Sequence, residues 1–233
     1  MKRYRIADLT VDMEVSGRTE QQAEAYAIAK DGPADITLSC DVRGVLALNP
    51  EISDYDTAEY LGTGAMFSRK LLSFNGSYLH ASAVMLEDRA YLFSAPSGTG
   101  KSTHTEKWCR LFGAAYINDD KPALRLIDGV WYAYGTPWSG KHNLSAPGGV
   151  RIGGIAFVKR GEKNEIRRLC AEEALPYFMS QSIWRLPDRE TMERQLLLVD
   201  KLLGQIPVWE LTCRNDDEAA MVSHRAMTAE TRK

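Results

Sequence analysis

The alternation of apolar and polar residues predicts strands in the first part of the chain. Apolar side chains alternate with polar ones over Leu9–Val15 and again over Ile36–Val42, which is typical of a strand with one buried face. The stretch Thr57–Leu72 has the pattern of a helix, although two glycines interrupt it. We therefore expect residues 1–74 to form a β-rich portion that packs on the rest of the chain, not necessarily as a separate domain.

Residues 78–135 show the pattern of two hairpins with a helix between them. The expected elements are strands Tyr78–Leu86 and Ala90–Ser94, a helix Lys101–Phe112, a strand Ala114–Asn118 and a hairpin over Pro122–Gly135. The first hairpin should turn near Asp88, and Gly113 should end the helix. The second should turn at Asp128-Gly129, a pair that favours two-residue hairpin turns.

The last third of the chain combines strands with helices. We expect a third hairpin from Ile152–Val158 and Glu165–Leu169, helices Ala171–Ile183 and Arg189–Leu203, a strand Val208–Cys213 and a helix from Asp216 onward. Strands on both sides of the first helix and helices late in the chain indicate an α/β core with a mixed sheet over residues 75–233.

The composition of the chain argues against nucleic acid and membranes as binding partners. The chain has 233 residues, 26% of them charged, and a net charge of −2, so no strong field attracts nucleic acid or an anionic membrane. No apolar run approaches the roughly 18 residues of a membrane span, and the basic N-terminus lacks the apolar region of a signal peptide. The four cysteines lie far apart, which fits reduced thiols. We expect a cytoplasmic protein without nucleic-acid or membrane partners, and a homo-oligomer is compatible with these data.

The segment Ala95–Ser102, Ala-Pro-Ser-Gly-Thr-Gly-Lys-Ser, has the pattern of a phosphate-binding P-loop between a strand and a helix. Glycines allow successive backbone N–H groups to point inward at an anion. The start of the helix adds about half a positive charge. Lys101 would hold the β- and γ-phosphates and Ser102 would offer its hydroxyl to Mg²⁺. The nucleotide-binding residues expected are Ser97, Gly98, Thr99, Gly100, Lys101, Ser102 and Thr103.

Hairpin geometry predicts that three further segments meet this loop. A turn centred near Asp88 places His80 across from Pro96, and a turn at Asp128-Gly129 places Asp120 across from Pro137. A parallel return after the loop helix would bring Asp119 to the same sheet edge.

Adjacent strand residues point to opposite faces, so Asp119 and Asp120 suit two different roles. One carboxylate can hold Mg²⁺ and the other can accept a proton from an attacking hydroxyl. The alternative is a solvated turn or a helix cap. His80 could orient the catalytic aspartate, or could be an ordinary strand histidine. The loop that faces the aspartates supplies four candidate substrate contacts, Thr136, Trp138, Ser139 and Lys141. Trp138 could equally be a packing residue, and Lys141 could equally be a surface residue.

The order of a strand histidine, a P-loop and a strand ending in Asp-Asp resembles the catalytic domain of bacterial HPr kinase/phosphorylase over about Ser77–Asp120. The resemblance implies a fold related to the nucleotide core of phosphoenolpyruvate carboxykinase. It also implies that Asp119 is the general base, with His80 near it, and that Ser102 binds Mg²⁺. The second aspartate, Asp120, is then the carboxylate available to the metal.

These observations predict a kinase that uses ATP, or GTP, with Mg²⁺ and phosphorylates a hydroxyl, most suitably a serine of a protein or peptide. Lys101 and Asp119 would be its principal catalytic residues, with His80. The family's metal-binding glutamate signature is replaced by Tyr134–Gly140, which has no carboxylate. A nucleotide-binding regulator without turnover is therefore an alternative, as are a kinase of a small-molecule hydroxyl and a simple NTPase.

Overall fold

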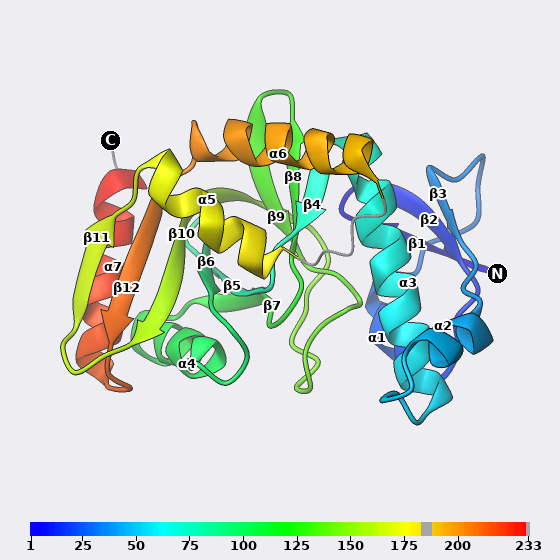
Figure 1. The fold of residues 1–233 in the computed structure, drawn as a ribbon, viewed down its shortest axis with the longest axis horizontal. Helices are drawn as coiled ribbons and strands as arrows, with labels where there is room; N and C mark the ends of the chain where they lie inside the picture. Colours follow the sequence, from blue (N-terminus) through cyan, green and yellow to red (C-terminus); the bar gives the residue numbers. More distant parts are fainter. Residues whose placement is uncertain (183–187, 232–233) are drawn as a thin grey trace.

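The structure is a computed structural model that describes residues 1–182 and 188–231. Its larger part is a curled mixed sheet with helices on both faces (Figure 1). The strands of this sheet are β4 (Gly76–Tyr78), β5 (Ala81–Leu86), β6 (Arg89–Ser94), β7 (Ala115–Asn118), β8 (Ala123–Ile127), β9 (Val130–Tyr134), β10 (Gly149–Arg160), β11 (Glu165–Arg168) and β12 (Val208–Cys213). Their order is β4-β8-β9-β10-β6-β5-β7, with β12 beside β10 and β11 beside β12.

The long strand β10 joins two parts of the sheet. Its first residues, Gly149–Arg151, pair antiparallel with β9, and its later residues pair parallel with β6 and β12. The first part of the sheet, β4-β8-β9, is a set of antiparallel hairpin strands. The second part contains β6, the strand that leads into the glycine-rich loop, and β6 lies between β10 and β5. The expected mixed α/β architecture is confirmed.

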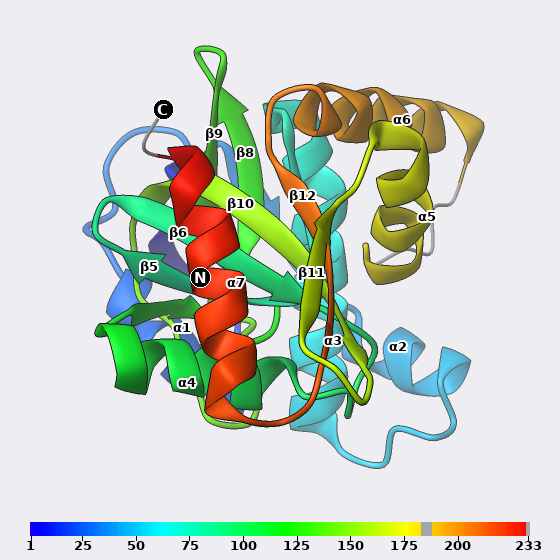
Figure 2. The same ribbon diagram turned by 90° about the vertical axis from the view of Figure 1, so that its left-hand side faces the viewer.

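Helices cover both faces of this second part (Figure 2). Helices α4 (Lys101–Phe112) and α7 (Asp217–Thr231) pack on one face, and α5 (Ala171–Gln181) and α6 (Arg189–Leu203) pack on the other. Alternation along β6 explains both layers: Tyr91 and Phe93 contact Trp108 of α4, whereas Ala90 and Leu92 belong to the core beneath α5 and α6. In the described part of the chain, no helix is both long and apolar enough to cross a bilayer.

The N-terminal segment contains a small sheet and three α-helices. The elements are β1 (Lys2–Ile6), β2 (Leu9–Met13), β3 (Ile36–Leu38), α1 (Gly17–Ala23), α2 (Val42–Leu48) and α3 (Tyr55–Leu71). This segment has more residues in helices than in strands, so the expectation of a β-rich portion is wrong. The predicted strand over Ile36–Val42 stops at Leu38, because the Asp41 carboxylate accepts the Gly44 N–H and caps α2. This segment shares one hydrophobic core with Tyr78 and Tyr134 of the larger sheet and with Trp138 of the loop after β9.

Two of the three predicted hairpins form. The second has the expected register, with Ile127 opposite Val130. The first is displaced by one residue, because Glu87 adopts a left-handed φ of 55° and the turn is shorter than expected. Ala81 therefore faces Ser94, which brings His80 level with Ala95 instead of Pro96.

The third hairpin is wrong. Strand β12 lies between β10 and β11, parallel to the first and antiparallel to the second. The predicted end of the helix at Ile183 lies outside the described residues, and the helix that is described ends at Gln181.

Candidate active site

The glycine-rich loop over residues 95–100, which the sequence predicts to bind phosphate, connects β6 to α4. Gly98 and Gly100 have φ values of 77° and 120°, in the region that disfavours L side chains. A Cβ at either position would meet nothing within 4 Å, so the requirement for glycine is conformational. Gly100 is the N-cap of α4, and the positive end of that helix therefore begins at the loop. These features fit the binding of an anion such as a phosphate.

Lys101, the first residue of α4, is buried against the loop. Its Nζ donates a hydrogen bond to the carbonyl oxygen of Ala95 at 2.7 Å. Burial lowers the pKa of the ammonium group, and the negative charge of Asp120 counteracts that effect. This hydrogen bond holds the lysine at the loop, and a phosphate would compete with one backbone carbonyl for it.

A cleft of about 1030 Å³ brings together most of the residues singled out in the sequence. It is lined by His80, Ser97, Gly98, Gly100, Lys101, Ser102, Thr103, Asp119, Asp120 and Lys141, and also by Glu106, Tyr116, Gly140, His142 and Leu144. Thr99 lines a smaller cavity instead. The strand after α4, β7, runs in the same direction as β6 with β5 between them, and this parallel return carries the Asp119-Asp120 pair to the loop.

Asp119 is a nearly buried carboxylate, with 7% of its surface exposed. Its Oδ1 accepts a hydrogen bond from the backbone N–H of Gly140 at 2.5 Å. Burial raises the pKa of Asp119, and the neighbouring charge of Asp120 adds to this, while the Gly140 hydrogen bond opposes it. A carboxylate whose pKa is raised above its ordinary value is better suited to accept a proton.

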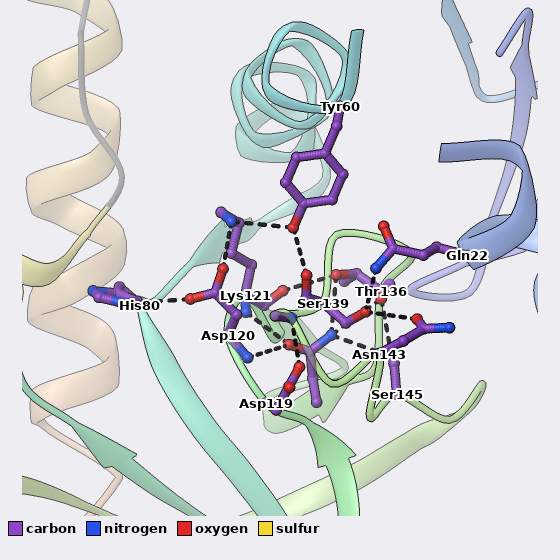
Figure 3. Close-up of polar contacts among 12 residues, drawn as sticks. Gln22, Tyr60, His80, Asp119, Asp120, Lys121, Thr136, Ser139, Asn143 and Ser145 are labelled. Atoms are coloured by element: carbon purple, nitrogen blue, oxygen red, sulfur yellow. Dashed lines mark hydrogen bonds and ion pairs between the residues drawn. The ribbon is translucent and has the colours of Figure 1, made fainter. Parts of the chain in front are cut away.

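Asp120 lies in a different environment (Figure 3). Its Oδ1 is 3.2 Å from Nε2 of His80, and its Oδ2 is 2.5 Å from Nζ of Lys121. Burial alone would raise the pKa of Asp120, but the hydrogen bond from His80 and the charge of Lys121 lower it to about 2. Asp120 is therefore an anion throughout the neutral pH range, whereas burial disfavours the anionic form of Asp119.

Residues of the N-terminal segment reach this network (Figure 3). Tyr60 of α3 donates its hydroxyl hydrogen to the Ser139 carbonyl at 2.6 Å, and its oxygen lies 3.3 Å from Nζ of Lys121. Gln22 of α1 donates to the Ser139 hydroxyl at 3.1 Å. Sequence reasoning did not identify Tyr60 or Lys121 as site residues. Lys121 could have been identified from the sequence, because it directly follows the aspartate pair. No residue pattern around Tyr60 indicates that it belongs to the site.

Three of the four predicted substrate residues do not line the cleft. Thr136, Trp138 and Ser139 are fully buried. Thr136 donates to the carbonyl of Lys121 at 2.8 Å. Trp138 donates to the Thr63 hydroxyl at 3.1 Å and belongs to the hydrophobic core shared with the N-terminal segment. These residues build the loop, and Lys141 alone among the four reaches the cleft.

Few side chains of the cleft could serve as metal ligands. Within residues 1–182 and 188–231, no group of three or more His, Cys, Asp or Glu side chains could hold a metal. Mg²⁺ commonly takes one or two protein oxygens and completes its shell with water and substrate phosphates. Ser102 and Asp120 both line the cleft and could supply such oxygens.

Comparison with known proteins gives a distant structural similarity. No family model matches the sequence, and no curated protein matches it. Among solved structures, the chain is similar to the Hpr(Ser) kinase/phosphatase from Coxiella burnetii, with 9% sequence identity and a TM-score of 0.39, over 67% of this chain and 90% of that chain. The similarity is distant and concerns the fold alone.

Proposed function

We propose that this protein is a kinase that transfers the γ-phosphoryl group of ATP, or GTP, to a hydroxyl with the help of Mg²⁺. One observation carries the proposal: a single cleft has a glycine-rich phosphate loop on one wall and a buried carboxylate with a raised pKa on another. The first feature holds an anion and the second accepts a proton. Phosphoryl transfer to an alcohol needs both.

Each residue has a part in the proposed reaction. The loop amides and Lys101 would hold the phosphates and stabilise charge on the transferred group. Ser102 and Asp120 would hold Mg²⁺, which supplies further positive charge between the phosphates. The oxygen of the acceptor hydroxyl would bond to the γ-phosphorus while the bond between that phosphorus and the β–γ bridging oxygen breaks. Asp119 would take the proton of the hydroxyl in this step.

The size of the cleft supports a sizeable acceptor. Sites for drug-sized ligands occupy roughly 300–1,000 Å³, and this cleft reaches about 1030 Å³. Space therefore remains beside a phosphate chain. The wall facing the loop includes Lys141, His142 and Leu144, which offer both polar and apolar contacts. We propose a serine of a protein or peptide as the acceptor, with a free small-molecule hydroxyl as the narrower alternative.

A nucleotide-binding regulator without turnover is the second candidate. Asp120 is already bonded to His80 and Lys121, and a metal would have to displace or share these partners. A protein that keeps them would bind nucleotide without arranging it for transfer.

A transfer assay separates the candidates. The protein is incubated with Mg²⁺ and γ-labelled ATP in the presence of serine peptides, free hydroxy amino acids and other small alcohols. A kinase forms ADP and labelled acceptor in equal amounts. A regulator binds ATP in calorimetry but forms no ADP, and a simple NTPase releases label only as inorganic phosphate. Either of the last two results would contradict the proposal.

A further inference from the structure

Tyr60 of α3 lies beside the aspartate pair, although it belongs to the N-terminal segment (Figure 3). It is buried, with 4% of its surface exposed. Its hydroxyl group lies 2.6 Å from the carbonyl oxygen of Ser139 and 3.3 Å from Nζ of Lys121. Because an ammonium group can only donate, the phenolic oxygen accepts from Lys121, and its single hydrogen is directed at the carbonyl.

One peptide group connects this hydroxyl to Asp119. The carbonyl that Tyr60 holds belongs to Ser139, and the N–H group of the same peptide is that of Gly140, which donates to Oδ1 of Asp119 at 2.5 Å. A peptide group is planar and rigid, and in the trans form its C=O and N–H point in opposite directions. The orientation of the carbonyl therefore fixes the direction of the N–H.

The Gly140 N–H is the principal restraint on the Asp119 side chain. Within residues 1–182 and 188–231, no other residue donates a hydrogen bond to this carboxylate. The peptide also approaches it closely, because a Cβ added at Gly140 would lie 2.9 Å from Oδ2 of Asp119. A side chain at this position would displace the carboxylate, so the contact requires glycine.

The side chain of Ser139 is held by other residues. Its Oγ accepts a hydrogen bond from Gln22 at 3.1 Å and donates one to Oδ1 of Asn143 at 2.9 Å. In the described ranges of the chain, Tyr60 is the one residue that holds the carbonyl of Ser139. Loss of the phenolic hydroxyl would thus free the peptide group to turn while the other contacts keep the loop in place.

We propose that Tyr60 is a positioning residue, which orients the Asp119 carboxylate through the peptide group between Ser139 and Gly140. This inference rests on the proposed kinase function, in which Asp119 accepts the proton of the acceptor hydroxyl. Proton transfer requires the base at hydrogen-bond distance, and a misplacement of about 1 Å can lower a rate about 10²-fold. The N-terminal segment then contributes to the transfer step through α3.

Tyr60→Phe tests the inference, because it removes the hydroxyl group and keeps the ring. The matched control is Tyr134→Phe. Tyr134 is buried in the same core and donates its hydroxyl hydrogen to Oδ2 of Asp8 at 2.7 Å, again between the N-terminal segment and the larger sheet. Single-turnover transfer from ATP to a serine peptide, KM for that peptide and calorimetric ATP affinity are measured for both variants. Circular dichroism verifies folding.

We expect Tyr60→Phe to lower the transfer rate at saturating ATP and peptide by about 10–10², with ATP affinity and KM within about twofold of wild type. Tyr134→Phe should leave the rate unchanged. In the Asp119→Asn background, Tyr60→Phe should cause no further loss, because both changes act on one group. A wild-type rate in Tyr60→Phe, or an equal loss in both backgrounds, would overturn the inference and leave the kinase assignment intact.

Hydrogen exchange of the Gly140 amide, followed by NMR, is a second measurement that needs no turnover. The wild-type amide should exchange slowly, and Tyr60→Phe should accelerate its exchange at least about tenfold relative to Tyr134→Phe. Equal exchange in both variants would overturn the inference, as would free exchange in the wild type, even if Tyr60→Phe does not fold. A wild type that transfers phosphate to no acceptor would overturn the proposed function, and the amide exchange alone would then decide whether Tyr60 orients the carboxylate.

Discussion

Replacement of Lys121 by Met removes the ammonium group beside Asp120 and keeps a side chain of similar length. The pKa of Asp120 is lowered from 3.8 to about 2, against the effect of burial, by hydrogen bonds and charges from His80 and Lys121. A shift of roughly two pKa units corresponds to about 2–3 kcal/mol of folding free energy at neutral pH. Because His80 supplies part of it, we expect Lys121→Met to reduce the free energy of unfolding by about 1–2 kcal/mol at pH 7.

The dependence on pH distinguishes this charge effect from lost packing. A carboxyl group whose pKa is lowered by folding stabilises the protein above the unfolded pKa. That contribution is lost as the pH falls from about 4 toward about 2, when Asp120 takes up a proton in the folded state. The penalty of Lys121→Met should therefore shrink over this range.

Urea unfolding followed by circular dichroism, at pH 7 and again near pH 3, measures the penalty. The control Lys163→Met removes a charge from an exposed lysine and should change stability by less than about 0.5 kcal/mol. In the Asp120→Asn background, Lys121→Met should cost clearly less than in the wild type. A penalty that is equal at both pH values and in both backgrounds would refute the reasoning and assign the loss to packing against Tyr60.

Three further predictions concern single residues. Gly100→Ala places a side chain at a φ of 120°; urea unfolding should show a loss of about 1–3 kcal/mol, and calorimetry should show weakened ATP binding. Trp138→Phe keeps an aromatic ring in the core but removes the hydrogen bond to Thr63. The free energy of unfolding should therefore fall by about 1–3 kcal/mol, and the KM for the acceptor should be unchanged. A raised KM at equal folded fraction would instead identify Trp138 as a substrate contact. Ser102→Ala should weaken ATP binding in the presence of Mg²⁺ and leave binding in EDTA nearly unchanged; equal losses in both conditions would speak against a metal role.

Features that are determined by a few consecutive residues could be predicted from the sequence. The glycine-rich loop between a strand and a helix is one, because its glycines, lysine and following helix are contiguous. The second hairpin is another, since Asp128 and Gly129 both adopt positive φ values, 49° and 79°, as such a turn requires. The first hairpin has Glu87-Asp88 at its turn, without glycine or asparagine, and its register was misplaced by one residue.

Features set by distant contacts could not be predicted. Strand β12 inserts between β10 and β11, and no pattern within those two strands reveals a third partner. Trp138 is buried because α3 packs over its loop. The same helix brings Tyr60 to Lys121, next to the aspartate pair. The opposite pKa shifts of Asp119 and Asp120 likewise follow from their surroundings, because the two residue types are identical.

The most direct test of the kinase assignment compares wild type with Asp119→Asn at saturating ATP and Mg²⁺ in a single-turnover transfer assay. The carboxamide can still accept the Gly140 hydrogen bond but cannot take the acceptor's proton. We expect ATP affinity within about threefold of wild type and a transfer rate lower by about 10²–10⁴. Transfer at the wild-type rate by Asp119→Asn would contradict the account.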